Sequence, residues 1–173
     1  EEGYPEPLKT IFDPPLALSI RGEYRDPLAV AMVGSRKCSA YGLRQADRFG
    51  QELSSLGVTV VSGLARGIDT ASHKGALRNG RTIAVLGSGL SHIYPYENKK
   101  LALQIAEQGC VMSEFGAHSP PHRIHFPRRN RIVSGLSLGT LVIEAAEKSG
   151  ALLTADWAME QGREIFCLPG SVE

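Results

Sequence analysis

Apolar, strand-like runs alternate with helix-like segments along most of this chain, and this alternation restricts its fold more than any other feature. The runs at 28–33, 58–61 and 82–86 are hydrophobic on both faces, which is typical of strands in the middle of a parallel sheet. Apolar residues at helical spacing over 43–56, closed by Gly57, predict a helix between the first two runs. The pattern predicts an α/β fold: an extended, Rossmann-like, mostly parallel and doubly wound sheet with helices on both faces.

The remaining elements follow the same alternation. Residues 1–27 are rich in proline and are expected to form a lead-in packed on the core, with a short strand at 16–21. Residues 28–173 are expected to form the Rossmann-like domain. Its later part is predicted to contain helices at 69–77, 97–108 and 151–161, strands at 110–113, 138–143 and 164–168, and a long loop with a short helix between 113 and 138.

Each of the three apolar runs ends in a loop that contains glycine. In the clearest case, residues 60–69, a strand leads through small residues into a helix. This arrangement leaves backbone N–H groups unpaired at the positive end of the helix dipole, so it suits a phosphate or another anion, although a similar turn also serves packing alone. Because parallel strands share one C-terminal edge, the loops at 34–36, 62–63 and 87–89 are expected to meet there.

These glycines do not form the dinucleotide fingerprint. The G-x-G-x-x-G motif would require glycine at position 92, where His92 stands, and Arg36 occupies the place of the second glycine after Gly34. The P-loop motif is also absent from the sequence. We therefore expect a Rossmann-like fold without a nucleotide cofactor.

A second informative stretch is 115–143, which contains four arginines and no acidic residue. Three of these arginines fall within 128–131, where they repel one another unless an anion lies among them. Arginine grips phosphate through two parallel hydrogen bonds, and Phe126 offers a flat face for a base. The pattern favours a nucleic-acid groove over the alternative, a solvated basic turn beside a buried phenylalanine.

Three other motifs are interpreted as structural or accidental. The histidines at 118, 122 and 125 flank two prolines that would break an aligning helix, and no cysteine or carboxylate joins them, so no metal site is predicted. The G-x-S-x-G match at 135–139 precedes a strand, unlike a nucleophile elbow. Asp69 and His73 are expected to form a cap and a hydrogen bond rather than an acid–base couple.

The composition of the chain restricts the partners and the cellular location that we expect. Lys+Arg is 19 and Asp+Glu is 18, so net charge does not identify a partner. The three cysteines lie far apart without a C-x-x-C pair, which is typical of a reducing compartment. We see no membrane-spanning apolar run and no signal peptide, and therefore expect a cytoplasmic location.

Taken in order, the motifs resemble those of the DNA-processing protein A family, also called DprA or Smf. The resemblance covers nearly the whole chain, from about Tyr4 to the C-terminus. It is carried by VGSR at 33–36, SGLARGID at 62–69, AVLGSG at 84–89, Tyr94-Pro95 with Asn98, Ser113-Glu114, FPRRNRI at 126–132, EAA at 144–146, GALLT at 150–154, QGR at 161–163 and Pro169-Gly170.

The resemblance implies a protein that binds single-stranded DNA without sequence preference and without enzymatic turnover. It further implies protection of incoming DNA, loading of the RecA recombinase during natural transformation, and a head-to-head homodimer. Carried over residue by residue, the family's phosphate pocket, glycine loop and basic groove correspond to Gly34, Ser35, Arg36, Ser62, Gly63, Gly67, Asn98, Phe126, Arg128, Arg129, Asn130 and Arg131.

The chain departs from the family pattern in two places. Many members carry Lys or Arg just after the Tyr-Pro pair, where this chain has Tyr96 and Glu97, so one basic contact is expected to be missing. Many members also carry a small N-terminal helical domain and a C-terminal winged helix. This chain shows neither, and we interpret it as the core domain of a longer protein.

Two alternatives from other functional classes stay open. One is a LOG-like phosphoribohydrolase that cleaves nucleoside monophosphates, which the residues at 34–36 and 139–140 faintly resemble. The other is a nucleotide-binding module without a DNA role. Against the enzyme, apolar residues at 141–143 occupy its acidic positions, and the first carboxylate, Glu144, is expected instead to cap or orient the turn at 128–131.

Overall fold

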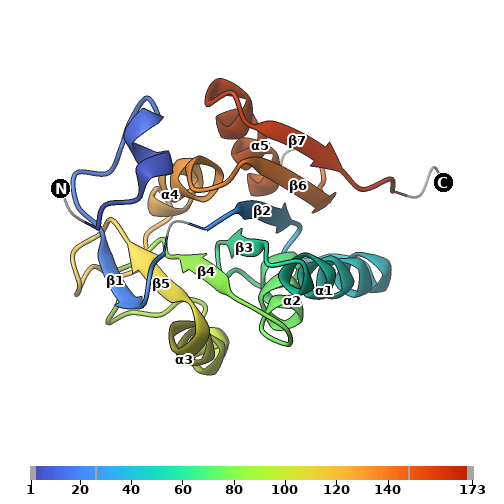
Figure 1. The fold of residues 1–173 in the computed structure, drawn as a ribbon, viewed down its shortest axis with the longest axis horizontal. Helices are drawn as coiled ribbons and strands as arrows, with labels where there is room; N and C mark the ends of the chain where they lie inside the picture. Colours follow the sequence, from blue (N-terminus) through green and yellow to red (C-terminus); the bar gives the residue numbers. More distant parts are fainter. Residues whose placement is uncertain (1–2, 26, 148, 171–173) are drawn as a thin grey trace.

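The computed structural model describes residues 3–25, 27–147 and 149–170. Seven strands of this part of the chain form one sheet in the order β1-β5-β4-β3-β2-β6-β7 (Figure 1). Neighbouring strands are parallel except β1 and β5, which confirms the mostly parallel sheet. The strands are β1 (Ser19–Gly22), β2 (Ala29–Gly34), β3 (Thr59–Ser62), β4 (Thr82–Val85), β5 (Cys110–Ser113), β6 (Gly139–Glu144) and β7 (Glu164–Cys167).

Helices cover both faces of the sheet, as the alternating pattern predicts (Figure 1). One face carries α1 (Ala40–Ser55), α2 (Ile68–Ala76) and α3 (Lys99–Gln108), which follows the short 3₁₀ helix η2 (Tyr96–Asn98). The other face carries α4 (His125–Gly135), α5 (Gly150–Glu160) and the 3₁₀ helix η1 (Glu6–Thr10). Among the described residues, none of these helices has the length and apolar character needed to cross a membrane.

The strands sort their side chains into two hydrophobic layers. On β2, Ala31 and Val33 belong to the cluster beneath α4 and α5, whereas Met32 belongs to the cluster beneath α1 and α2. Val60 and Val61 on β3 divide in the same way. Because successive side chains of a strand point to opposite faces, strands buried on both sides must be apolar at every position, which explains the continuous apolar runs in the sequence.

The N-terminal segment packs on the face that carries α4. Leu8 is fully buried and Ile11 is nearly so, and both belong to the cluster beneath α4 and α5. The strand expected at 16–21 is shorter than predicted, because Leu16 is fully exposed and pairing with β5 begins only at Ser19. This strand closes one edge of the sheet in the antiparallel direction.

The strand order reverses beside β2. The chain builds β2, β3, β4 and β5 outward in one direction, and then crosses through α4 to place β6 on the other side of β2. Ser35 N–H donates to the Glu144 carbonyl oxygen at 2.7 Å, which joins the C-terminal ends of β2 and β6. In an open α/β sheet, a reversal of this kind leaves a crevice at the C-terminal strand ends, where ligands bind.

Candidate nucleic-acid interface

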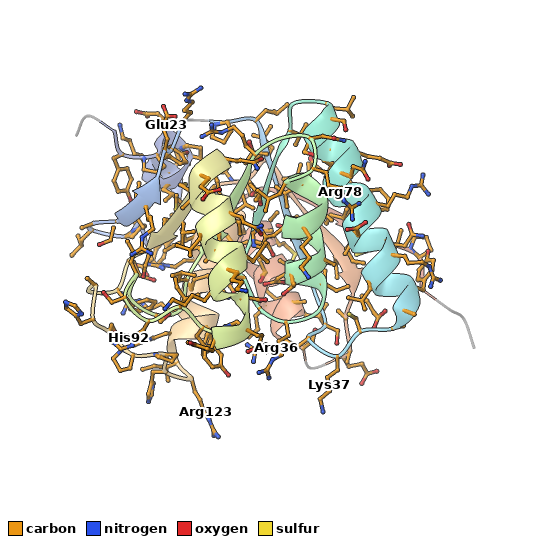
Figure 2. The ribbon with its side chains drawn as sticks, turned by 90° about the horizontal axis from the view of Figure 1, so that it is seen from below. Glu23, Arg36, Lys37, Arg78, His92 and Arg123 are labelled. Carbon is orange, nitrogen blue, oxygen red and sulfur yellow. The ribbon has the colours of Figure 1, made fainter. Side chains whose placement is uncertain are left out.

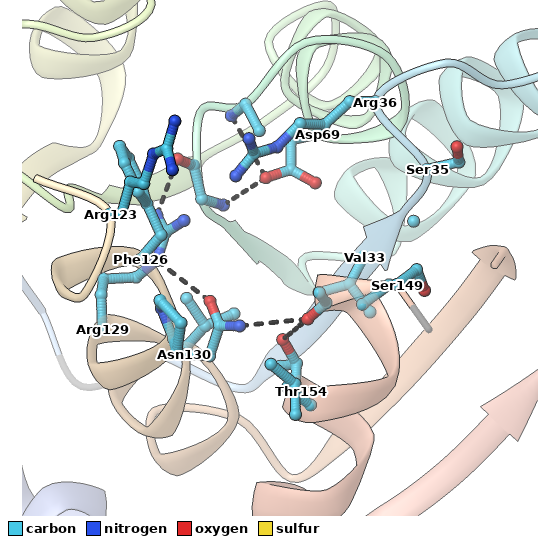
Figure 3. Close-up of a pocket in the computed structure, with 18 of the residues that line it drawn as sticks. Val33, Ser35, Arg36, Asp69, Arg123, Phe126, Arg129, Asn130, Ser149 and Thr154 are labelled. Carbon is cyan, nitrogen blue, oxygen red and sulfur yellow. Dashed lines mark hydrogen bonds between the residues drawn. The ribbon is translucent and has the colours of Figure 1, made fainter. Parts of the chain in front are cut away.

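A pocket of about 760 Å³ lies at this reversal point (Figure 3). One wall is the loop at 34–37 with Gly63, and the opposite wall is the first turn of α5. Two aromatic rings, Tyr94 and Phe126, lie 5.6 Å apart between their centroids and form part of the lining. The three glycine loops meet at one edge, as the sequence predicts: residues 34–36 and Gly63 line the pocket, and Gly87 packs against the Phe126 ring, where an added Cβ atom would lie 2.6 Å from it.

Three exposed cations line the pocket: Arg36, Lys37 and Arg123. In the part of the chain that the structure describes, no carboxylate forms an ion pair with any of them. Figure 2 shows all three along one edge of the molecule. The Arg36 guanidinium carbon lies 5.4 Å from the centre of the Phe126 ring, so the cation and the flat apolar face are adjacent. A group of unpaired cations beside an aromatic ring suits a phosphate joined to a planar base.

Gly67 allows the loop at 62–67 to lie close against the loop at 34–37. Its φ of 72° lies in the region that favours glycine, and an added Cβ atom would lie 2.4 Å from the Ser35 carbonyl oxygen. The Ile68 N–H donates to the same oxygen at 3.2 Å. The loop at 62–67 therefore packs against the backbone of Ser35 and Arg36 and holds them in place. Gly67 itself is not among the residues that line the pocket.

Asp69 occupies the backbone groups that the sequence assigned to an anion. Its carboxylate accepts the N–H groups of Gly63 and Ala65 at 3.1 and 3.2 Å, so the chain itself supplies the negative charge at this strand–helix joint. Burial raises the pKa of the Asp69 carboxyl, while the nearby Arg129 charge and the two N–H groups act in the opposite direction. Contrary to the prediction from the strand–loop–helix pattern, the Gly63 N–H is therefore not unpaired, although Gly63 does line the pocket.

His73 plays no part in the pocket. Its Nδ1 lies 2.7 Å from the Thr82 hydroxyl oxygen, and burial lowers the pKa of His73 to about 3, so its ring is neutral near pH 7. Asp69 and His73 thus act separately. Asp69 accepts N–H groups of the preceding loop and does not cap α2 as expected, and His73 is a hydrogen-bonded core residue.

Arg129 and Asn130 line the pocket and hold its walls together. Arg129 is 4% exposed, and its Nη1 donates to the carbonyl oxygens of Gly63, at 2.7 Å, and of Val85. Burial lowers the pKa of Arg129 to about 10, although Asp69 favours its charged form. Asn130 Nδ2 donates to the Gly150 carbonyl oxygen at 3.1 Å, which joins α4 to α5 (Figure 3). Both side chains position the site from within the fold.

Arg131 is buried outside the pocket, which corrects the expectation that it lines the groove. Its guanidinium donates two hydrogen bonds to the Glu114 carboxylate, at 2.7 and 2.9 Å, and a third to the Asp13 carboxylate. Burial lowers the pKa of Arg131, but these two carboxylates outweigh that effect and raise it. Glu114 and Asp13 therefore supply the negative charge beside Arg131.

Arg128 lies on the same side of α4 as Arg131 but faces solvent. Its Nε lies 3.5 Å from the Glu114 carboxylate. The segment at 128–131 is part of a helix and not a turn. Neighbouring arginines consequently point in different directions around the helix axis, and they cannot all face one groove.

Two more residues assigned to DNA contact are buried in structural roles. The Ser62 hydroxyl donates to the Met32 carbonyl oxygen at 2.6 Å, and Asn98 Nδ2 donates to the Leu64 carbonyl oxygen at 2.9 Å. Glu144, expected near 128–131, instead accepts the N–H and O–H of Ser39 at the start of α1, at 2.9 and 2.6 Å. These long-range contacts leave no periodic signal in the sequence.

The structure also adds residues to the site. Lys37 follows the Gly-Ser-Arg loop directly, and Arg123 belongs to the stretch without acidic residues, so both could have been included from the sequence. The contribution of Gly150 and Thr154 in α5 depends on the crossover that brings α5 against α4. No local pattern in the sequence indicates that α5 packs against α4.

We expect Gly67→Ala to lower the free energy of unfolding by about 2–4 kcal/mol, because it combines backbone strain with a clash against Ser35. Gly57→Ala is the matched control, since Gly57 has φ 78° and open space around its missing side chain. That variant should lose only about 1–2 kcal/mol. Urea denaturation measures both values, and equal losses would contradict a tight contact between the two loops.

The fold and the site define a Rossmann-like domain whose basic, aromatic pocket lies at the reversal of strand order. Residues 1–173 match the family model described as DNA recombination-mediator protein A, and the chain belongs to this family. It is 51% identical to Protein Smf of Escherichia coli over 175 residues, which cover 99% of this chain and 47% of that protein. It is 46% identical to DNA processing protein DprA of Streptococcus pneumoniae over 176 residues, covering 99% and 62% respectively. The chain thus spans about half to three-fifths of the length of these two relatives.

Solved structures agree with this assignment. The X-ray structure of the S. pneumoniae DprA superposes with a TM-score of 0.92 at 44% identity, covering 99% of this chain and 62% of that one. DNA processing protein A of Helicobacter pylori, described for its single-stranded DNA binding mode, has a TM-score of 0.93 at 31% identity, covering 100% and 81%. A molybdenum cofactor binding protein of Rippkaea orientalis, at 0.63 and 18% identity over 87% and 80% of the two chains, shares the fold alone.

Proposed function

We propose that this chain binds single-stranded DNA without sequence preference. The observation that carries the proposal is the group of cations at the mouth of the pocket, Arg36, Lys37 and Arg123, none of which forms an ion pair within the described residues, together with the Phe126 ring beside Arg36. In this arrangement the cations hold consecutive phosphates and a base stacks on Phe126. Stacking is indifferent to base identity because every base has a π face, and it requires bases that are not enclosed in a duplex.

We further propose that the protein binds DNA without chemical turnover. Asp69, the carboxylate among the described lining residues, accepts backbone N–H groups, and Glu144 at the end of β6 accepts hydrogen bonds from Ser39. In our proposal the bound DNA is protected and passed to RecA during natural transformation, by a homodimer in the cytoplasm. Membership of a family described as recombination mediators supports this role.

We expect the logarithm of the association constant to fall linearly with the logarithm of salt concentration, with a slope of about −2 to −3.5 for three to five phosphate contacts. The slope arises because each neutralised phosphate releases bound counterions. Fluorescence anisotropy with a labelled oligothymidine over a salt series measures it, with duplex DNA of equal length as the control. An association constant that does not change with salt concentration, or tighter binding of the duplex, would contradict the proposal.

A further inference from the structure

A second groove lies next to the pocket, on the other side of the segment at 92–96. It encloses about 450 Å³, and its lining includes Arg21 from β1, His92, Tyr96 and Lys99 from the start of α3. Tyr94, two residues before Tyr96, lines the first pocket. One short segment therefore presents an aromatic ring to each of the two depressions.

The second groove is basic and has an exposed aromatic face. Arg21 and Lys99 are exposed, and within the described residues no carboxylate forms an ion pair with either. The acidic neighbour Glu97 is engaged by Arg66. The Tyr96 side chain is 77% exposed, and the Lys99 ammonium group lies 5.9 Å from the centre of its ring.

The second groove begins at the edge that carries the first pocket, at His92, and extends from there towards Arg21, which pairs with Val111 near the start of β5. Figure 2 shows His92, Arg123, Arg36 and Lys37 in a row on this edge, whereas Glu23 and Arg78 lie towards the opposite one. A strand seated on Arg36 and Phe126 would pass Tyr94 and reach Tyr96, where the Glu97 carboxylate is paired with Arg66. Cations that follow a backbone, interleaved with aromatic rings, are the arrangement found in grooves for single-stranded nucleic acid.

We propose that the second groove is an additional subsite for the same DNA strand, in which a base stacks on Tyr96 and the flanking phosphates contact Lys99 and Arg21. This inference rests on the proposed function, because the first pocket must bind DNA for the strand to continue from it. It also makes a prediction of its own: the affinity for DNA must depend on whether the strand is long enough to occupy both depressions.

The test compares oligothymidines of about 5 and about 20 nucleotides, which bracket the ~4–16 nucleotides that one OB-fold covers. We expect the longer strand to bind more tightly to the unaltered protein. Lys99→Ala and Tyr96→Ala should each weaken binding of the longer strand by about fivefold or more and leave the shorter strand unaffected. Tyr96→Phe should retain affinity because it keeps the ring. Lys74→Ala is the control, since Lys74 is exposed near the end of α2.

For Lys99→Ala, the salt slope measured with the longer strand should fall by about 0.7, as expected for one lost phosphate contact. Equal affinity of the unaltered protein for both lengths would overturn the second subsite and leave the first pocket standing. Unchanged binding of the longer strand by Lys99→Ala and Tyr96→Ala would also overturn it. Failure of the unaltered protein to bind either strand would overturn the proposed function together with this inference.

Discussion

Arg36→Ala is expected to weaken single-stranded DNA binding by about 10- to 150-fold, because a charge-assisted hydrogen bond to phosphate contributes ~1.5–3 kcal/mol. Arg36 is exposed at the mouth of the pocket and is adjacent to Phe126, so its removal takes away a phosphate contact beside the stacking face. Anisotropy titrations at fixed salt measure the loss. The salt slope should become shallower by about 0.7 if one phosphate contact is removed.

Arg66→Ala is the matched control for that experiment. Arg66 is also exposed and lies in the neighbouring loop, but its guanidinium pairs with Glu97. We expect its affinity to change by less than about threefold, since a surface ion pair contributes only about 0–1 kcal/mol. Both variants should unfold at nearly the temperature of the unaltered protein. Equal losses of affinity in the two variants would contradict the pocket as we describe it.

Arg131→Ala is expected to lower the free energy of unfolding by about 3–5 kcal/mol, because it leaves the Glu114 carboxylate buried without its partner. The Arg131 and Glu114 side chains are only 2% and 6% exposed, and two hydrogen bonds join them. Urea denaturation measures the change in stability. Affinity for DNA per folded molecule should be unaffected, because Arg131 lies outside the pocket.

Arg128→Ala, on the same helix, provides the control. Its side chain is 61% exposed and lies at the edge of ion-pair distance from Glu114, so its loss should change stability by less than about 1 kcal/mol. If Arg128→Ala destabilised the fold as much as Arg131→Ala, the distinction between the two arginines would be wrong. If Arg131→Ala were stable but unable to bind DNA, Arg131 would belong to the groove after all.

The fold was largely predictable because its signals are local. Strands buried on both faces require continuous apolar runs, and β2, β3 and β4 start and end close to the predicted positions. Helix boundaries were less accurate. The helix expected from 43 begins at Ala40, where Ser39 accepts the N–H of Gly42, and the helix expected from Glu97 begins at Lys99 after a 3₁₀ turn. Capping and short turns shift such boundaries without changing the apolar period.

The site was predictable only to the level of segments. The sequence indicated that the loops at 34–36, 62–63 and 87–89 belong together, because the C-terminal ends of parallel strands share an edge. The basic stretch at 126–131 joined them only through the resemblance to the family. The sequence could not show that Asp69 already occupies the Gly63 N–H, or that α5 supplies a wall. Both depend on contacts formed when separate elements pack together.

By itself, the sequence determined the α/β class, the edge at which ligands gather and the family, since each is written in residue order and spacing. Only the tertiary structure decided which arginines of α4 face solvent, which hold the pocket together and which stabilise the core. The partners of Arg131 lie 17 residues away at Glu114 and 118 residues away at Asp13. An arginine has the same charge in every one of these roles, and its role is set by whether the fold brings a carboxylate, a carbonyl group or open water to its guanidinium.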